Sequence, residues 1–123
     1  MDLEKLMDET QQWVLRNMDV LSMPDNTIEV ATFQIDSFGD TIYCFVEEKD
    51  GYYRVSDDGR MLFKLDPGQT NQELYETAAE IAVNSGYYFD EDVCEIYAEV
   101  EEDDVANAVM RLAQLQLAIS YLG

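Results

Sequence analysis

Apolar residues recur along the chain with two periods, one typical of helices and one typical of strands. The spacing from Asp2 to about Met18 predicts a first helix. A second helix is expected after Thr70, a suitable N-cap, and a third after Glu101–Asp104, whose acids suit the positive end of a helix. The third helix has apolar residues three, four or seven apart, at Val105, Ala108, Val109, Leu112, Leu115, Ile119 and Leu122.

Between these helices the period shortens to that of strands. Strands are predicted over 28–35, 41–46 and 52–55, with turns at Asp36–Asp40 and at Asp50-Gly51. The strand over 41–46 is apolar on both sides, so we expect it to be central in a sheet. These three strands predict an antiparallel meander.

Two further segments complete the pattern. Residues 87–100 predict a hairpin, in which Glu95, Tyr97 and Glu99 alternate with apolar residues and should face water. Residues 61–65 fit either a fourth strand or a short helix capped by Asp57. The whole order predicts one α+β domain over 1–123, an antiparallel β-sheet (meander plus C-terminal hairpin) packed against three helices.

Charge restricts the possible partners. The 123 residues include 7 Lys and Arg against 27 Asp and Glu, a net charge of −20, whereas a small domain usually carries a net charge of about 2–8 in magnitude. Direct binding to nucleic acid or to an anionic membrane needs cations that the chain lacks, so both are excluded. A basic protein partner is expected. The alternative is that the charge only keeps the surface solvated.

Several kinds of chemistry are not indicated. The chain has no histidine, no cofactor-binding motif and no nucleophile constellation, so we expect no enzyme activity, no cofactor and no metal. The N-terminus lacks the pattern of a signal peptide and no apolar run is as long as a membrane span, which favours a cytoplasmic location. Cys44 and Cys94 lie in apolar strand patterns and are expected to be buried thiols.

The acidic run between residues 90 and 104 is the first candidate surface. It contains nine acids and no base, and part of it lies on a predicted strand that would fix the spacing of its carboxylates. We expect these residues, with one tyrosine among them, to bind the partner: Asp90, Glu91, Asp92, Glu95, Tyr97, Glu99, Glu101, Glu102, Asp103 and Asp104.

A possible second surface consists of Asp36, Asp40, Tyr53, Asp57 and Asp58. Asp58-Gly59 is a pair that tight turns favour, so its structural reading is a turn after a strand. The alternative reading is a metal site of a small hydrolase or nuclease, because several carboxylates could hold Mg²⁺ or Ca²⁺. Pro24-Asp25 followed by Glu47–Lys49 also has the form of a nuclease motif, although a net charge of −20 opposes binding of a polyanion.

Three segments together resemble a known family. They are DGYYRVSDDG at 50–59, TNQELYETAAEIAVNSG at 70–86 and YYFDEDVCEIYAEV at 87–100. In this combination the chain resembles domain of unknown function 1828, a bacterial and phage family, although Ala31-Thr32-Phe33 stands where the family commonly has Thr-Pro-Phe. The resemblance implies a small bacterial or phage protein, acting in the bacterial host cell, whose gene lies on a mobile element. It implies no known activity.

These observations lead to one main hypothesis and two alternatives. The main hypothesis is an acidic, non-enzymatic binding protein that mimics nucleic acid and inhibits a basic host defence protein, of the anti-CRISPR or anti-restriction kind. The step to a defence target rests on analogy with small acidic proteins of phages and plasmids. The alternatives are the metal-dependent hydrolase and a toxin–antitoxin or structural interaction partner. The sequence does not predict the target or the oligomeric state.

Overall fold

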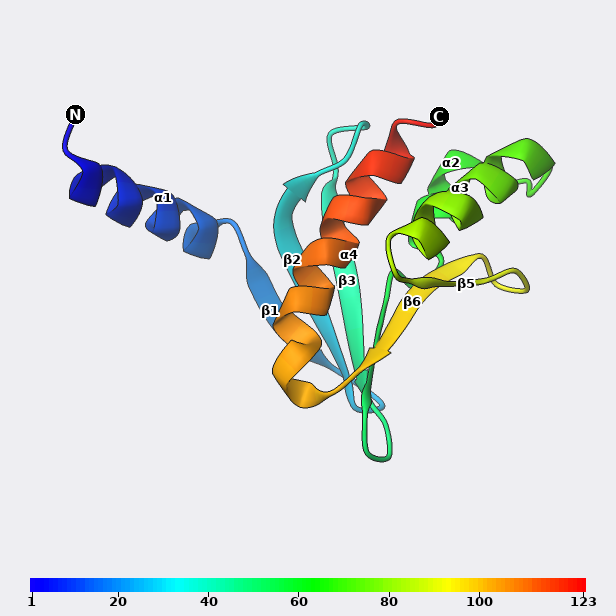
Figure 1. Cartoon of the computed structure of the whole chain (residues 1–123), viewed down its shortest axis with the longest axis horizontal. Coiled ribbons are helices and arrows are strands. Elements are labelled where there is room, and N and C mark those ends of the chain that lie inside the picture. The colour runs from blue at the N-terminus through cyan, green and yellow to red at the C-terminus, as the bar shows by residue number, and fades with distance from the viewer.

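The computed structural model describes residues 1–123 and has the α+β fold class that the sequence predicts (Figure 1). Its six strands form one antiparallel sheet in the order β1-β2-β3-β4-β6-β5. None of its helices combines the length and the apolar composition that a membrane span requires. In chain order the elements are α1 (Leu3–Arg16), β1 (Asp19–Met23), β2 (Thr27–Ile35), β3 (Thr41–Glu48), β4 (Tyr53–Ser56), α2 (Arg60–Leu65), α3 (Gln72–Asn84), β5 (Tyr88–Asp90), β6 (Glu95–Val100), a 3₁₀ turn (Glu102–Asp104) and α4 (Val105–Ser120).

The predicted meander and hairpin are both present and share one sheet. Strands β2, β3 and β4 form the meander, and β6 of the hairpin pairs with β4, so that Val55 lies opposite Ala98. Strand β3 is central, as its apolar residues on both sides predict. Cys44 and Val46 face the core, while Phe45 is buried on the other side of the sheet.

Helix α4 lies across one face of the sheet and forms the core with it (Figure 1). The predicted apolar stripe is confirmed at Ala108, Val109, Leu112, Leu115 and Ile119, which are all buried. Helices α2 and α3 pack beside α4. On the opposite face of the sheet the Arg60 guanidinium lies 4.9 Å from the centroid of the buried Phe45 ring, while Glu99 of β6 is exposed.

Two local predictions are resolved by side-chain hydrogen bonds. Residues 60–65 form a helix, and the Asp57 carboxylate accepts the N–H of Met61 in its first turn. Helix α3 is capped by Asn71, whose Oδ1 accepts the N–H of Leu74 at 3.1 Å. The predicted cap, Thr70, is wrong because its N–H and hydroxyl both donate to the carboxylate of Asp66.

The two cysteines are free thiols in different settings. Cys44 is buried, as predicted, and burial raises its pKa to about 12. Cys94 is only half-buried and lies in the turn before β6 with a φ of 55°, so its placement inside a strand is wrong.

The first predicted helix forms but does not join the layer that α2, α3 and α4 make. Helix α1 has no buried residue and projects away from the sheet beside its edge (Figure 1). The chain after it forms β1, an edge strand that the sequence pattern does not predict, because the composition of Ser22 to Asn26 is typical of a break. The helical spacing of α1 therefore gives the helix an apolar side, and this side remains largely exposed.

Candidate functional site

Strand β6 holds the centre of the acidic run, and its alternation sets the direction of each side chain. Its residues at 96 and 98 are buried against the core, so Glu95, Tyr97 and Glu99 point to the face that α4 does not cover. Pairing fixes their neighbours: Glu99 lies opposite Arg54, and Tyr97 lies opposite Tyr88. The predicted alternation along this strand is confirmed.

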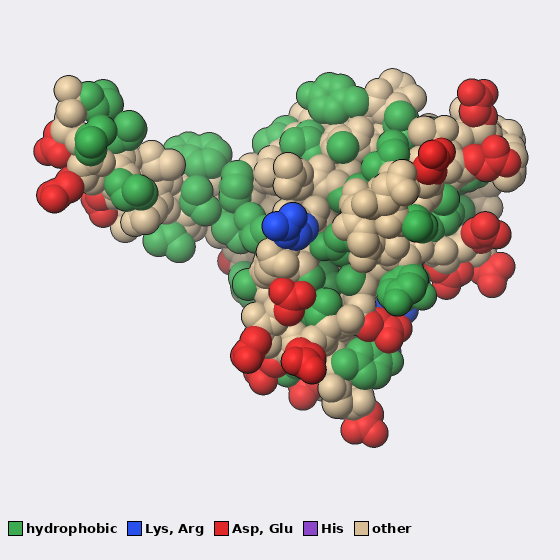
Figure 2. Space-filling model, viewed as in Figure 1, with side chains coloured by type: hydrophobic (Ala, Val, Ile, Leu, Met, Phe, Trp, Pro, Cys, Tyr) green, Lys and Arg blue, Asp and Glu red, His purple; other side chains and the backbone are tan.

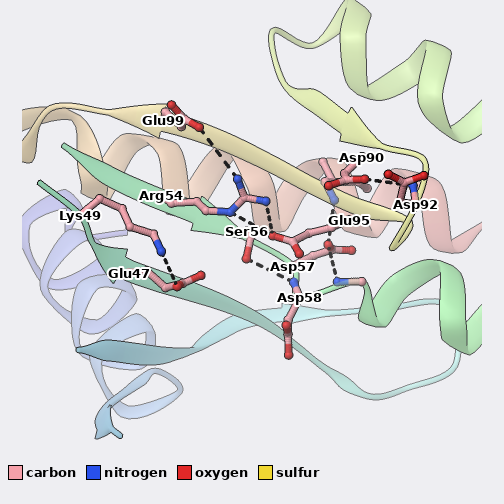
Figure 3. A network of polar contacts seen from close by, with 12 residues as sticks. Glu47, Lys49, Arg54, Ser56, Asp57, Asp58, Asp90, Asp92, Glu95 and Glu99 are labelled. Atoms are coloured by element: carbon pink, nitrogen blue, oxygen red, sulfur yellow. Dashed lines mark hydrogen bonds and ion pairs between the residues drawn. The ribbon is translucent and has the colours of Figure 1, made fainter. Parts of the chain in front are cut away.

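Arg54 of β4 binds both glutamates (Figure 3). Its Nη2 and Nε donate to Oε1 of Glu95 at 2.8 and 3.2 Å, and its Nη1 lies 3.9 Å from Oε1 of Glu99. Its guanidinium also lies 3.7 Å from the centroid of the Tyr97 ring. Burial alone would lower the pKa of Arg54, but the hydrogen bond and charge of Glu95 raise it overall.

This ion pair corrects one expectation. Glu95 was predicted to face water, but only 15 % of its side chain is exposed. The prediction is wrong because Arg54, 41 positions away in the sequence, lies against it. Glu99 keeps 46 % of its side chain exposed and remains available to a partner.

The remaining acids of the run lie at the two ends of β6. Asp90 ends β5, Glu91 and Asp92 occupy the turn between β5 and β6, and Glu101–Asp104 follow β6. Six residues of strand place these groups about 20 Å apart. Figure 2 shows acidic side chains in separate groups, toward the right and the bottom of the body and on the helix at the left. The acidic run is continuous in the sequence, but in the structure it forms two clusters at the two ends of β6. Glu95 and Glu99, which pair with Arg54, lie between them.

The cluster after β6 includes Glu48, which the sequence does not indicate, and Tyr53, which was expected on the possible second surface. Tyr53 lies opposite Glu48 in β3 and opposite Val100 in β6. Burial, together with the charges of Glu102 and Glu48, raises the pKa of Tyr53. We call this group the acidic tip: Glu48, Tyr53, Glu99, Glu101, Glu102, Asp103 and Asp104. Its acids are exposed, and all but Glu99 have no ion-pair partner.

Asp57, Asp58 and Gly59 form the tight turn that their sequence predicts. Asp58 and Gly59 both have positive φ, 57° and 70°. The Asp57 carboxylate is fully buried and accepts the N–H groups of Gly59 and Ile96, each at 2.9 Å, and that of Met61 at 3.4 Å. Burial raises the pKa of Asp57 to about 6 despite these donors. Asp57 therefore fastens β6 and α2 to the turn.

Asp36 and Asp40, in the turn between β2 and β3, share Lys64 of α2. Lys64 Nζ lies 2.6 Å from Oδ2 of Asp36 and also pairs with Asp40. The Asp36 carboxylate accepts the N–H groups of Phe38 and Asp40 at 2.9 and 3.1 Å. Burial raises the pKa of Asp36, but Lys64 and these two donors lower it overall. With Lys64 and Arg60, the two aspartates line a cavity of about 540 Å³.

The hydrolase hypothesis requires Asp36, Asp40, Asp57 and Asp58 to meet around a cation. In the structure the Asp57 carboxylate instead accepts three backbone N–H groups, and the carboxylates of Asp36 and Asp40 pair with Lys64. No three His, Cys, Asp or Glu side chains of the chain are arranged to hold a metal ion. The nuclease-like motif offers no free ligand at Glu47 either, since Lys49 lies 3.1 Å from its carboxylate.

Fold and surface together define a small, acidic α+β protein with helices on one face of its sheet and free carboxylates at one end. The model of the family described as Domain of unknown function DUF1828 matches residues 32–119, and the chain belongs to this family. The matched segment begins within β2 and ends within α4, so α1 and β1 lie outside it. No curated protein and no solved structure matches the chain.

Proposed function

We propose that this chain is a non-enzymatic binding protein whose acidic tip occupies the phosphate-binding groove of a basic, nucleic-acid-binding protein. One observation carries the proposal. The tip presents six exposed carboxylates from β3, β6 and the turn before α4, and only Glu99 has an ion-pair partner.

The charge of the whole molecule supports a basic partner. A net charge of −20 surrounds the tip with a negative potential that attracts cationic surfaces and repels nucleic acid. Such a potential raises the rate of association with a basic protein. Carboxylates at the tip then take the positions that phosphates occupy in the partner's own complex with nucleic acid.

The rigidity of the neighbouring face also supports the proposal. Arg54 fixes Glu95 and restrains Glu99, and the Tyr97 ring stacks on Tyr88 with centroids 5.4 Å apart. Side chains that are already ordered lose less entropy when a partner binds. Tyrosines beside the carboxylates add apolar contact area of the kind that protein interfaces favour.

The particular form that we propose is inhibition of a host defence nuclease, of the anti-restriction or anti-CRISPR kind, by a protein of a phage or mobile element. It acts in the cytoplasm of the bacterial host. This step rests on analogy with small acidic proteins of such elements and not on a contact in the molecule. A cleavage assay with the captured nuclease tests it, since an inhibitor of this kind stops cleavage at stoichiometric concentration.

Charge reversal at the tip tests the proposal. The immobilised chain is incubated with a bacterial lysate, and the captured proteins are identified by mass spectrometry. The variant Glu99→Lys/Glu102→Lys/Asp103→Lys should lose the partner. The control Glu73→Lys/Glu76→Lys/Glu80→Lys makes the same change in net charge on exposed positions of α3 and should keep it.

Three results would contradict the proposal. Equal loss of the partner in both variants would mean that only the overall charge matters. Equal retention of the partner by both variants would mean that the binding surface lies outside the acidic tip. A captured partner that does not bind nucleic acid would favour the toxin–antitoxin or structural alternative.

A further inference from the structure

The cavity beside α2 lies where strand β4 ends before its neighbour does. Strand β4 ends at Ser56, opposite Phe45 of β3, whereas β3 begins four residues before Phe45, at Thr41. On the side of β4, the first residues of β3 therefore have no neighbouring strand. Helix α2 follows β4 after a turn and lies across the resulting space, which has a volume of about 540 Å³. One wall of the cavity is thus the unpaired start of β3.

The backbone of Tyr43 points into this cavity. In an antiparallel sheet, successive residues of a strand direct their N–H and C=O groups to opposite neighbours. Glu48 N–H donates to the carbonyl of Asn26 on the β2 side, so the even-numbered residues of β3 bond toward β2 and the odd-numbered ones toward β4. Tyr43 C=O accepts Nε2 of Gln116 at 3.0 Å, while Tyr43 N–H has no strand beside it. Such an edge is a template for another extended backbone.

Gln116 of α4 brings a second unpaired group to the cavity. Only 2 % of Gln116 is exposed, and its Nε2 donates to Tyr43 and to Sγ of Cys44. Its Oε1 accepts no hydrogen bond. No side-chain oxygen or nitrogen that is sealed from solvent lacks a partner, so this Oε1 opens to the cavity that Gln116 lines. A nearly buried carbonyl oxygen without a donor favours a ligand with an N–H group.

Arg60 provides a free positive charge at the same cavity. Its guanidinium lies 5.3 Å from the centroid of the Tyr43 ring, and it forms no ion pair although the chain has 27 acids. Lys64, the other cation of the lining, already pairs with Asp36 and Asp40. One free guanidinium suits one negative charge, and a carboxylate matches its planar arrangement of donors.

These three groups together indicate the class of ligand. The last residues of a peptide offer a backbone for Tyr43, an N–H group for Gln116 Oε1 and a terminal carboxylate for Arg60. A ligand with several phosphates brings more negative charge than one free cation compensates, and the net charge of −20 repels it.

We propose that this cavity binds the carboxyl-terminal end of a peptide, which pairs with β3 at Tyr43 and places its carboxylate on Arg60. The site is separate from the acidic tip, because Thr41 and Glu48 are the two ends of β3 and lie about 23 Å apart along the strand. Peptide binding therefore does not depend on the proposed function of the tip.

Titration of the full chain with two peptide pools, followed by the NMR signals of its amides, tests the proposal. One pool contains N-acetylated tripeptides with free C-terminal carboxylates, and the other contains the same tripeptides as C-terminal amides. The carboxylate pool should shift the backbone signal of Tyr43 and the side-chain signal of Gln116. The amide pool should not, because it lacks the charge that Arg60 binds. Equal shifts with both pools, or no shift with either at about 1 mM, overturn the proposal.

A charge variant and its control locate the carboxylate, with the tightest tripeptide from subdivided pools as the probe. Arg60→Met should weaken its binding at least tenfold and leave the melting temperature unchanged, since Arg60 is exposed and its guanidinium has no ion-pair partner. Arg16→Met removes another exposed arginine without an ion pair, from α1, and should leave the affinity unchanged. Equal affinities of the two variants overturn the proposal.

Hydrogen exchange tests the pairing with β3. The exchange of the Tyr43 amide should slow at least tenfold when the tripeptide is bound, because its N–H then donates to a peptide carbonyl. An unchanged rate at saturation overturns the pairing. The same tripeptide at the C-terminus of an unrelated carrier protein distinguishes two sources of the ligand. Binding of the carrier supports the end of a partner protein as the ligand, and binding of the tripeptide alone supports a free peptide.

Discussion

The turn after β4 and the acidic tip are both rich in carboxylates, but they use them differently. In the turn, Asp57 is fully buried and its oxygens accept three N–H groups. At the tip, Glu101 to Asp104 are exposed and lack ion-pair partners. A buried carboxylate whose oxygens are already bonded stabilises the fold, while an exposed and unpaired one remains available to a partner.

The comparison separates two roles that the sequence presents alike. Asp57-Asp58 and Asp103-Asp104 are both pairs of adjacent aspartates, and neither pair reveals whether its oxygens are occupied. Asp36 and Asp66 belong with Asp57, because Lys64 and backbone amides hold the first, and the amides of Thr70 and Asn71 hold the second. Changes in the turn should therefore alter stability, and changes at the tip should alter binding.

Gly59→Val should have the largest effect on stability. Gly59 has a φ of 70°, and a Cβ atom there would lie 2.9 Å from the carbonyl oxygen of Val93. We expect a loss of about 4 kcal/mol or more, because backbone strain and a clash with backbone combine. Urea denaturation measures this. Gly39→Val is the control, since its φ of 86° brings strain but no atom lies within 4 Å of the added Cβ. An equal loss of stability in both variants would mean that the close approach of residue 59 to the Val93 carbonyl contributes nothing.

Substitution of the buried Asp57 should lower the stability of the fold much more than substitution of the exposed Asp58. Asp57→Ala leaves three N–H groups without their acceptor and should cost about 3 kcal/mol. Asp58→Ala should cost at most about 1 kcal/mol, because Asp58 is exposed and only its φ of 57° matters. Neither change should alter partner binding per folded molecule. A larger loss for Asp58→Ala, in the same denaturation measurement, would contradict this division.

The raised pKa of Asp57 predicts a specific dependence of stability on pH. Between about pH 4 and 6 the folded chain keeps a proton on Asp57 that the unfolded chain releases. The free energy of unfolding should therefore fall as the pH rises through this window, by up to about 3 kcal/mol. Asp36 and Asp66, whose pKa values are lowered, act in the opposite direction and only at lower pH.

Comparison with Asp57→Asn isolates this contribution from the general repulsion among the acids. Chemical denaturation at several pH values should give a flatter profile between pH 4 and 6 for the variant than for the wild type. Parallel profiles would show that Asp57 does not titrate in this window.

Arg54→Met should have a smaller effect on stability. The side chains of Arg54 and Glu95 are mostly buried, so removal of the cation leaves Glu95 partly desolvated without its partner. We expect a loss of about 1–2 kcal/mol. Lys49→Met removes the same charge from a more exposed pair with Glu47 and should cost less than about 0.5 kcal/mol. Thermal denaturation compares the two, and equal shifts would mean that Arg54 contributes no more than a surface ion pair.

The sequence predicts the elements that local periodicity determines and misses those that depend on distant residues. The spacing in α4 and the two-sided apolar pattern of β3 predict the core correctly, because each is a property of one segment. Strand β1 was missed because Pro24 follows it closely and its residues contribute nothing to the core. The exposure of α1 could not be predicted either, since an amphipathic pattern does not say which surface the apolar side meets.

The candidate site shows the same limit. Asp58-Gly59 was correctly predicted to be a turn, because its signal is local. The partner of Glu95 was missed because Arg54 meets it only through the pairing of β4 with β6. Glu48 joins the tip through the pairing of β3 and β4 with Tyr53 between, which no single segment predicts.

The central claim, that the acidic tip takes the place of nucleic acid, is tested most directly by competition for the captured partner. Its affinity for the chain is measured by calorimetry from about 50 to 500 mM salt, with and without duplex DNA. Exposed charge pairs should make the affinity fall at least tenfold over this range, and DNA and the chain should exclude each other from the partner. A ternary complex with DNA, or an affinity that salt does not change, would contradict the claim.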